Sequence, residues 1–266
     1  LNCLVNVRGD YLLFLASDDY IKPNYISKCV NLLETHLDTA FVMVHRSIID
    51  NNGDEIHEAP FYDSNYKMYP PSQLGVYFMS PVNPCMSQVF YRSIAVLTQS
   101  KRQTLNDTYY GHRFVDFQLC LQNPIIYCAE ALTAHRVHNE SDSEKITENL
   151  IQIVGQYVLN HQFEEMARPH EFSGIDKKFK KSLHRIAEVS LKYSVNSLVK
   201  GNKSLAKKYW HLSVAIDLDI EKSDLAQRLQ EAFYADDKKI IEKFKNSDQT
   251  NVRTVSYKPD PPFQNI

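Results

Sequence analysis

The sequence has no excess of positive charge and no long apolar run, and each absence excludes a class of protein. Its 266 residues carry 30 Lys and Arg against 32 Asp and Glu, a net charge of −2, so no basic field is available to attract nucleic acid. No apolar run approaches the roughly 20 residues that a membrane-spanning helix needs. We therefore expect neither a nucleic-acid partner nor a membrane span.

The cysteines form no CxxC pair and no spacing typical of a zinc finger. There are five of them, an odd number, and most lie in apolar runs. Reduced, buried thiols explain this pattern better than a disulfide framework, because disulfides are rare in reducing compartments. The pattern therefore predicts a cytoplasmic protein. The cysteines are Cys3, Cys29, Cys85, Cys120 and Cys128.

A short, continuously apolar run over residues 11–16 follows Arg8-Gly9-Asp10. Such a run is typical of a strand that is buried on both faces of a parallel sheet. Parallel strands need crossover partners, and few residues precede this one. We therefore expect that two or three earlier strand–helix units, of about 30 residues each, belong to the same domain and precede Leu1.

Apolar spacing and turn signals predict an α/β region followed by a helical one. Strands and helices alternate as far as Ser143, after which the pattern becomes helical, including a helical pair interrupted at Gly201-Asn202. The fold class predicted is α/β, a mostly parallel mixed sheet with flanking helices, followed by an α-helical region. The predicted divisions are residues 1–143, a helical extension over 144–246, and an extended, proline-containing tail over 247–266.

Ser17-Asp18-Asp19 follows the apolar run directly. Ligands of open α/β sheets bind beyond the carboxyl ends of the strands. Two adjacent carboxylates repel each other unless a cation or hydrogen-bond donors compensate, and a divalent ion that bridges a diphosphate would do so. A polar loop that caps the next helix is the alternative, and for the acidic pair alone it is the better one.

The surrounding residues favour a cation site over a loop that only caps the next helix. The stretch Arg8-Gly9-Asp10-Tyr11-Leu12-Leu13-Phe14-Leu15-Ala16-Ser17-Asp18-Asp19-Tyr20-Ile21-Lys22-Pro23 resembles the central signature of family 2 glycosyltransferases, which have the GT-A fold. Ala16 stands where the family often has Asp. The resemblance implies that Asp19 is a metal ligand, that Asp18 contacts the nucleotide ribose or the metal shell, and that Arg8 contributes to donor binding.

Two later segments resemble the family's remaining motifs in the expected order. Phe114–Leu119 resembles the "ED" motif at the start of a helix, with Val115 in place of Glu, which implies that Asp116 is the catalytic base. The alternative for Asp116 is a carboxylate that stabilises a helix N-terminus.

Arg136-Val137-His138 resembles the Arg-x-His segment that closes the catalytic domain. Alternation along a strand would place Arg136 and His138 on one side, where they could bind phosphate and metal respectively. The alternative is a surface strand with two ordinary polar side chains.

The resemblance implies metal-dependent, inverting transfer of a sugar from a nucleotide-sugar donor, UDP-linked, with Mn or Mg as the cofactor. The acceptor would be a glycan, a lipid-linked molecule or a protein, and the helical region could form a homo-oligomer or bind a partner. A sugar nucleotidyltransferase and a non-catalytic scaffold acting through the helical region remain the alternatives. The first would normally show a glycine-rich basic loop near its start, and none is visible.

Overall fold

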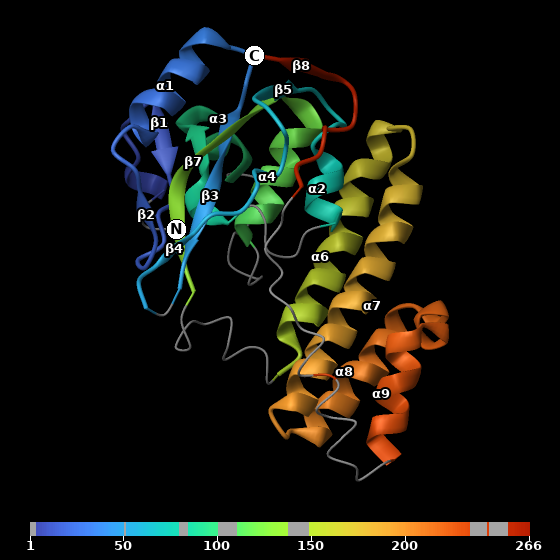
Figure 1. Ribbon diagram of the computed structural model, residues 1–266. Coiled ribbons are helices and arrows are strands. Elements are labelled where there is room, and N and C mark those ends of the chain that lie inside the picture. The colour runs from blue at the N-terminus through green and yellow to red at the C-terminus, as the bar shows by residue number, and fades with distance from the viewer. Residues whose placement is uncertain are drawn as a thin grey trace. The chain divides into compact units, whose positions relative to one another are not determined.

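The computed structural model describes residues 4–50, 52–79, 85–100, 111–137, 149–234, 244 and 255–266. The chain divides into two compact units. The α/β unit comprises Leu1–Asn139, Glu165–Ser173 and Arg253–Ile266, and the helical unit comprises Glu140–Glu164 and Gly174–Val252. Figure 1 shows both.

Eight strands form one mixed sheet in the α/β unit. Its main order is β1-β6-β3-β7-β5-β8, with β2 paired to β7 and β4 paired to β3. The strands are β1 (Tyr11–Leu13), β2 (Tyr20–Ile21), β3 (Phe41–Ile49), β4 (Glu55–Ile56), β5 (Tyr66–Met68), β6 (Val89–Arg92), β7 (Ile125–Arg136) and β8 (Phe263–Asn265).

The mixed sheet and its flanking helices were expected, but the prediction of mostly parallel pairing is wrong for the strands described. Among the strands that the structure describes, only β3 and β7 pair in parallel, over Val42–Ile49 and Ile126–Arg136. The strand β6 runs antiparallel to both of its neighbours, β1 and β3. A strand in the middle of a layered sheet is buried on both faces whichever way it runs, so an apolar run does not reveal direction.

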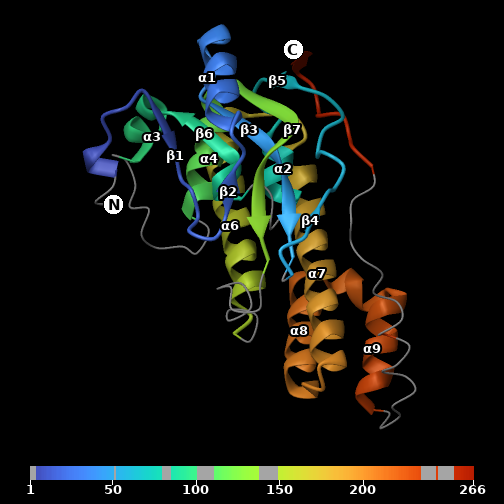
Figure 2. The same ribbon diagram turned by 60° about the vertical axis from the view of Figure 1, so that its left-hand side comes forward.

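Helices cover both faces of this sheet (Figure 2). Residues of α1 pack with one set of alternating strand residues, among them Val42, Val44 and Ile126. The opposite set includes Phe41 and Tyr91, and lies toward α2 and α4, whose Phe78 and Phe117 rings are 5.5 Å apart. The helices of this unit are α1 (Tyr25–Thr35), α2 (Leu74–Met79), α3 (Ser93–Ser100) and α4 (Gly111–Gln122).

The strand β1 is shorter and less buried than the sequence predicts. Its three residues are half-buried, and the chain leaves the strand after Leu13. Leu15 is exposed, so the apolar run continues into the connection that carries the acidic pair. An apolar run therefore located the strand correctly and overestimated its length.

The end of the chain is extended as expected, but the part described is a component of the sheet and not a separate tail. The strand β8 pairs antiparallel with β5, with Tyr66 opposite Asn265. The ring of Phe263 packs edge-on against Tyr66 at 5.1 Å. Pairing at a sheet edge gives this proline-containing segment partners for its backbone.

The helical unit is built around a close-packed hairpin. Its helices are α6 (Ile151–Ala167), whose last residues fall in the other unit, α7 (Ile175–Val199), α8 (Lys203–Ile216) and α9 (Asp224–Tyr234). The expected break is present: Gly201 has φ +82°, and the Asn202 side chain accepts a hydrogen bond from the amide of Leu205 at 3.0 Å, which caps α8. Trp210 is buried and donates to the carbonyl of Ala226, so it is a core residue.

Among the described residues, no helix combines the length and the apolar character that crossing a bilayer would require.

Candidate functional site

Asp18 and Asp19 lie in the turn that joins β1 to β2. The amide of Asp19 donates to the carbonyl oxygen of Ala16 at 3.3 Å. The strand β2 then pairs antiparallel with β7, with Tyr20 opposite Ala134. Asp19 directly precedes Tyr20 and His135 directly follows Ala134, so this register places Asp19 beside His135.

Three groups donate hydrogen bonds to the carboxylate of Asp19, or share one with it. Oδ1 lies 2.9 Å from Nδ1 of His135 and accepts from the backbone amide of Arg136 at 3.1 Å. Oδ2 accepts from the hydroxyl of Ser87 at 2.6 Å, and the same hydroxyl accepts from the amide of Ala16 at 3.1 Å. The Asp19 side chain is 2% exposed and that of His135 is 30% exposed. These bonds tie the turn after β1, the segment before β6 and the end of β7 together at one point.

The surroundings of Asp19 favour its ionised form. Burial alone would raise the pKa of this carboxyl, but hydrogen bonds from His135 and Ser87, the nearby imidazole and the amide of Arg136 together hold it below its ordinary value. A buried carboxylate held in its charged form is a suitable ligand for a cation.

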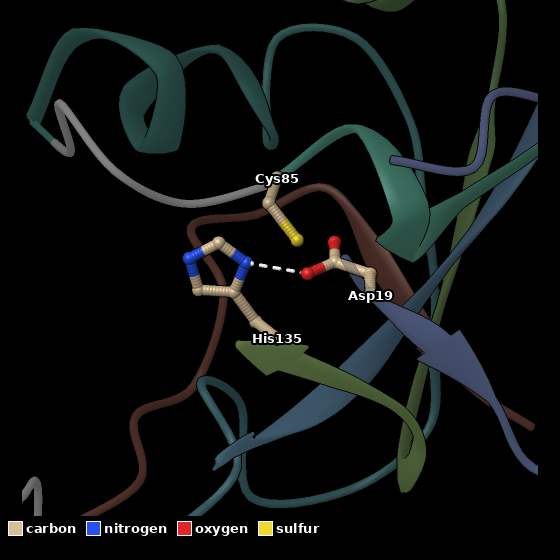
Figure 3. Close-up of side chains that lie close together, drawn as sticks. All are labelled: Asp19, Cys85 and His135. Atoms are coloured by element: carbon tan, nitrogen blue, oxygen red, sulfur yellow. Dashed lines mark hydrogen bonds and ion pairs between the residues drawn. The ribbon is translucent and has the colours of Figure 1, made fainter. Parts of the chain in front are cut away.

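Cys85 supplies a third potential ligand atom next to Asp19 and His135. One ligand atom from each of the three residues lies within 4.8 Å of the other two, and Figure 3 shows the thiol pointing toward the carboxylate. The backbone fixes the position of Cys85, since its amide donates to Oε1 of Gln88 at 3.0 Å, and Gln88 in turn donates to the carbonyl of Val44 at 2.8 Å. Burial raises the pKa of the Cys85 thiol, and the nearby Arg46 opposes that change.

Arg136, which the family resemblance suggests as a donor-binding residue, lies beside the acidic turn. Its Nε donates to the backbone carbonyl of Asp18 at 3.3 Å, and its amide donates to Asp19. The structure therefore brings Asp18, Asp19 and Arg136 together. The guanidinium of Arg136 and the carboxylates of Asp18 and Asp19, close together beyond the end of a strand, are groups that could bind a diphosphate and its metal.

Arg8 is not part of this group. It lines a cleft of about 430 Å³ together with residues such as Glu34 and Arg92. Because Tyr11 of β1 pairs with Arg92 of β6, this cleft is at the start of β1, whereas the acidic turn follows its end. The described structure thus separates Arg8 from the other predicted donor-binding residues.

Asp116 is fully buried within α4. The hydroxyl of Tyr91 donates to its Oδ1, and its Oδ2 has no hydrogen-bond partner among the described residues. Burial raises the pKa of Asp116 to about 7, although the Tyr91 hydrogen bond and the charge of Arg113 oppose the change. The helix begins at Gly111, so Asp116 is beyond the first turn and does not act as a helix N-terminal charge.

His138, the other predicted metal ligand, lies outside the described residues. The residues that complete the surroundings of Asp19 are Ser87, Cys85 and His135, and the sequence assigned none of them to the metal site. In the sequence, only its position next to Arg136 points to His135. Its contact with Asp19 depends on the pairing of β2 with β7, and a strand of two residues is too short to predict from sequence.

Comparison with known protein families finds a match over the first part of the chain. Residues 2–95 match the family model described as "Glycosyl transferase family 2", which is about a third of the chain. The match includes β1, the acidic turn, Ser87 and Cys85. Over these residues the chain is similar to that family, in agreement with the resemblance drawn from Arg8–Pro23. No curated protein matches the chain.

Among solved structures, the chain is similar to a crystal structure of S. aureus TarS 1-349, with 13% sequence identity, a TM-score of 0.44, and coverage of 88% of this chain and 69% of that one. It is also similar to the crystal structure of S. aureus TarS 1-349 in complex with UDP, with 15% identity, a TM-score of 0.37, and coverage of 87% and 68% respectively. Both likenesses are too distant to assign a ligand to this chain.

Proposed function

We propose that this chain transfers a sugar from a nucleotide-sugar donor, UDP-linked, to an acceptor hydroxyl, with the turn after β1 as the donor site. The observation that carries the proposal is the convergence of Asp18, Asp19 and Arg136 at the end of β1, within and beside the region that matches the glycosyltransferase family. Arg136 would bind phosphate oxygens, and Asp18 would contact the ribose or the metal shell.

Among the described residues, Asp19 is the one that suits the divalent cation implied by the family, Mn or Mg. Its carboxyl is buried, its pKa is held below the ordinary value, and it lies in the turn after β1. When bound, the cation supplies positive charge that neutralises the departing nucleoside diphosphate. Asp19 would hold it, and Arg136 would bind the phosphates. His138 remains the second predicted ligand.

Asp116 remains the predicted base for inverting transfer. One observation supports this role and another opposes it. Its pKa of about 7 suits a group that accepts a proton near neutral pH. Its complete burial and its hydrogen bond to Tyr91 keep an acceptor hydroxyl away from it in this conformation. Proton abstraction by Asp116 would thus require residues that cover it to move.

The two alternatives, a sugar nucleotidyltransferase and a non-catalytic scaffold, differ in their expected chemistry and in the region that would act. A sugar nucleotidyltransferase would consume or release pyrophosphate, and the match to the glycosyltransferase family favours transfer instead. A scaffold would act through the helical unit, and this unit is our proposed site for an acceptor chain, a partner or a second copy of the protein. The proposed acceptors are a glycan, a lipid-linked molecule or a protein, in the cytoplasm.

Turnover of several nucleotide sugars by the full chain, with and without Mn, tests the proposal. Release of nucleoside diphosphate with transfer to an acceptor, or slow transfer to water, would support it. Dependence on pyrophosphate would support the nucleotidyltransferase. No turnover and no nucleotide-induced thermal shift, in a chain that is folded by circular dichroism, would support the scaffold.

A further inference from the structure

The side chains of Asp19, Cys85 and His135 come from three separate segments and present a carboxylate, a thiol and an imidazole to one another. Their ligand atoms lie within 4.8 Å (Figure 3). Two of the three are fixed by the structure around them. Ser87 and the amide of Arg136 hold Asp19, and Gln88 holds the backbone of Cys85.

This combination of donor atoms does not match the preference of Mg or Mn. Those ions favour oxygen ligands, whereas thiolate together with imidazole suits zinc, and a site of this kind binds Zn²⁺ more tightly than Mn²⁺. We propose that Asp19, Cys85 and His135 form a Zn²⁺ site, which shares Asp19 with the site proposed for a donor-bound Mn or Mg and differs from it in the other two ligands.

The spacing suits such a site. Zinc bonds of about 2.0–2.3 Å in tetrahedral geometry separate neighbouring ligand atoms by about 3.3–3.8 Å. Atoms that now lie within 4.8 Å reach that spacing through small side-chain rotations. His135 is 30% exposed, which leaves one side open for water as the fourth ligand, an arrangement typical of zinc sites with three protein ligands.

The charges also suit zinc. Binding would convert the Cys85 thiol to a thiolate and release its proton to solvent, and the carboxylate and thiolate together would neutralise the ion. Burial raises the pKa of the Cys85 thiol, and the charge of Arg46, which is buried nearby, opposes that change. His135 would give the lone pair of Nδ1 to the metal with its proton on Nε2, so that coordination replaces the present contact with Asp19.

A consequence follows for catalysis, and it rests on the proposed function. Zinc held by all three residues would occupy Asp19, the ligand proposed for the donor's cation. Zinc should therefore inhibit Mn-dependent turnover. Zinc binding itself needs no donor, so it can be measured whether or not the chain transfers sugar.

Cobalt serves as the probe for this site because it takes the place of zinc and absorbs light when a thiolate binds it. Co²⁺ added to the metal-free full chain should produce a thiolate-to-cobalt charge-transfer band that one equivalent of Zn²⁺ removes. Cys85→Ser should abolish the band and weaken Zn²⁺ binding at least about tenfold, since even loss of groups that only support a ligand costs about 10–100-fold. Cys128→Ala removes a buried thiol of the core and should leave the band intact.

Alkylation of the wild-type protein provides a test that does not depend on folding of a variant. Cys85 is partly exposed, while Cys29, Cys120 and Cys128 are buried. Zn²⁺ should slow modification of Cys85 by iodoacetamide, measured on its peptide by mass spectrometry, and Mg²⁺ at the same concentration should not. Equal modification with and without Zn²⁺, or a cobalt band that persists in folded Cys85→Ser, would overturn the proposal and leave the proposed glycosyl transfer untouched.

Discussion

Nδ1 of His135 lies 2.9 Å from Oδ1 of Asp19, although 116 residues separate them along the chain. The pairing of β2 with β7 creates this contact, and Ser87 joins it from the segment before β6. The turn that carries the acidic pair is thus held by three distant parts of the α/β unit. Its geometry should depend on residues that the family signature does not contain.

Ser87→Ala should destabilise the α/β unit and disturb the acidic turn. The substitution leaves Oδ2 of Asp19 and the amide of Ala16 without their present partner. Loss of a buried hydrogen-bond partner typically costs about 1–3 kcal/mol of unfolding free energy, which denaturant titration would measure. Ser27→Ala, at an exposed serine of α1, should cost much less. Equal effects of the two substitutions would contradict the structural role given to Ser87.

Asp116 should make stability depend on pH between about 4 and 7. Its pKa is about 7 in the folded state against an ordinary 3.8, so the folded protein binds more protons than the unfolded chain in this range. The unfolding free energy should therefore fall as pH rises, by at most about 1.4 kcal/mol per pH unit. Asp116→Asn should remove this component, so that the variant gains stability relative to wild type as pH rises. If the difference in unfolding free energy between Asp116→Asn and wild type stays constant from pH 4 to 7, the raised pKa of Asp116 is contradicted.

The same substitution tests the proposed base. If Asp116 accepts the proton, Asp116→Asn should keep nucleotide binding and slow the chemical step by about 10²–10⁴-fold. Single-turnover rates and calorimetric titration with UDP separate these effects. A folded Asp116→Asn variant with an unchanged rate would leave Asp116 with the structural role that its burial indicates.

His138 and His135 can be distinguished through the metal dependence of nucleotide binding. The family resemblance predicts that His138→Ala weakens Mn-dependent binding of UDP, and that extra Mn partly restores it. His135→Ala is the matched comparison, because this imidazole contacts Asp19 directly. Normal Mn dependence in His138→Ala, with a loss in His135→Ala, would show that the ligand role was assigned to the wrong histidine.

The helical unit should contribute no group essential to the chemical step. Its described core is formed by apolar residues of α7, α8 and α9, such as Leu191, Trp210 and Phe233. Alanine at the exposed positions Lys192 and Glu231 should leave the single-turnover rate intact and change stability by about 0.5 kcal/mol or less. A hundredfold loss of rate from either change would show that the helical unit does contribute to the chemical step.

Local patterns predicted the elements of the fold well, and its long-range pairings poorly. Helical spacing located α1, α7 and α8, and the Asn202 cap was visible as a break in the pattern. Strand direction and the place of β8 in the sheet depend on which strands meet, and an apolar run carries no information about its neighbours.

The site shows the same limit. The proximity of Asp18, Asp19 and Arg136 could be expected because their motifs have recognisable residues in a recognisable order. Cys85 and His135 were missed because their relation to Asp19 arises from strand register and from the backbone contacts of Gln88. The burial of Asp116 depends on how α4 packs near Tyr91, which its local sequence does not reveal.

The most direct measurement compares nucleotide-sugar turnover of the wild-type chain with that of Asp19→Asn over a range of Mn concentrations. Asp219→Asn is the matched control, because it removes one carboxylate charge at an exposed position of the helical unit. We predict metal-dependent turnover by the wild type and the control, its loss in Asp19→Asn, and a smaller decrease in Asp18→Asn. Wild-type activity with the same Mn dependence in both the Asp19 and Asp18 variants would contradict the assignment of the donor site to this turn.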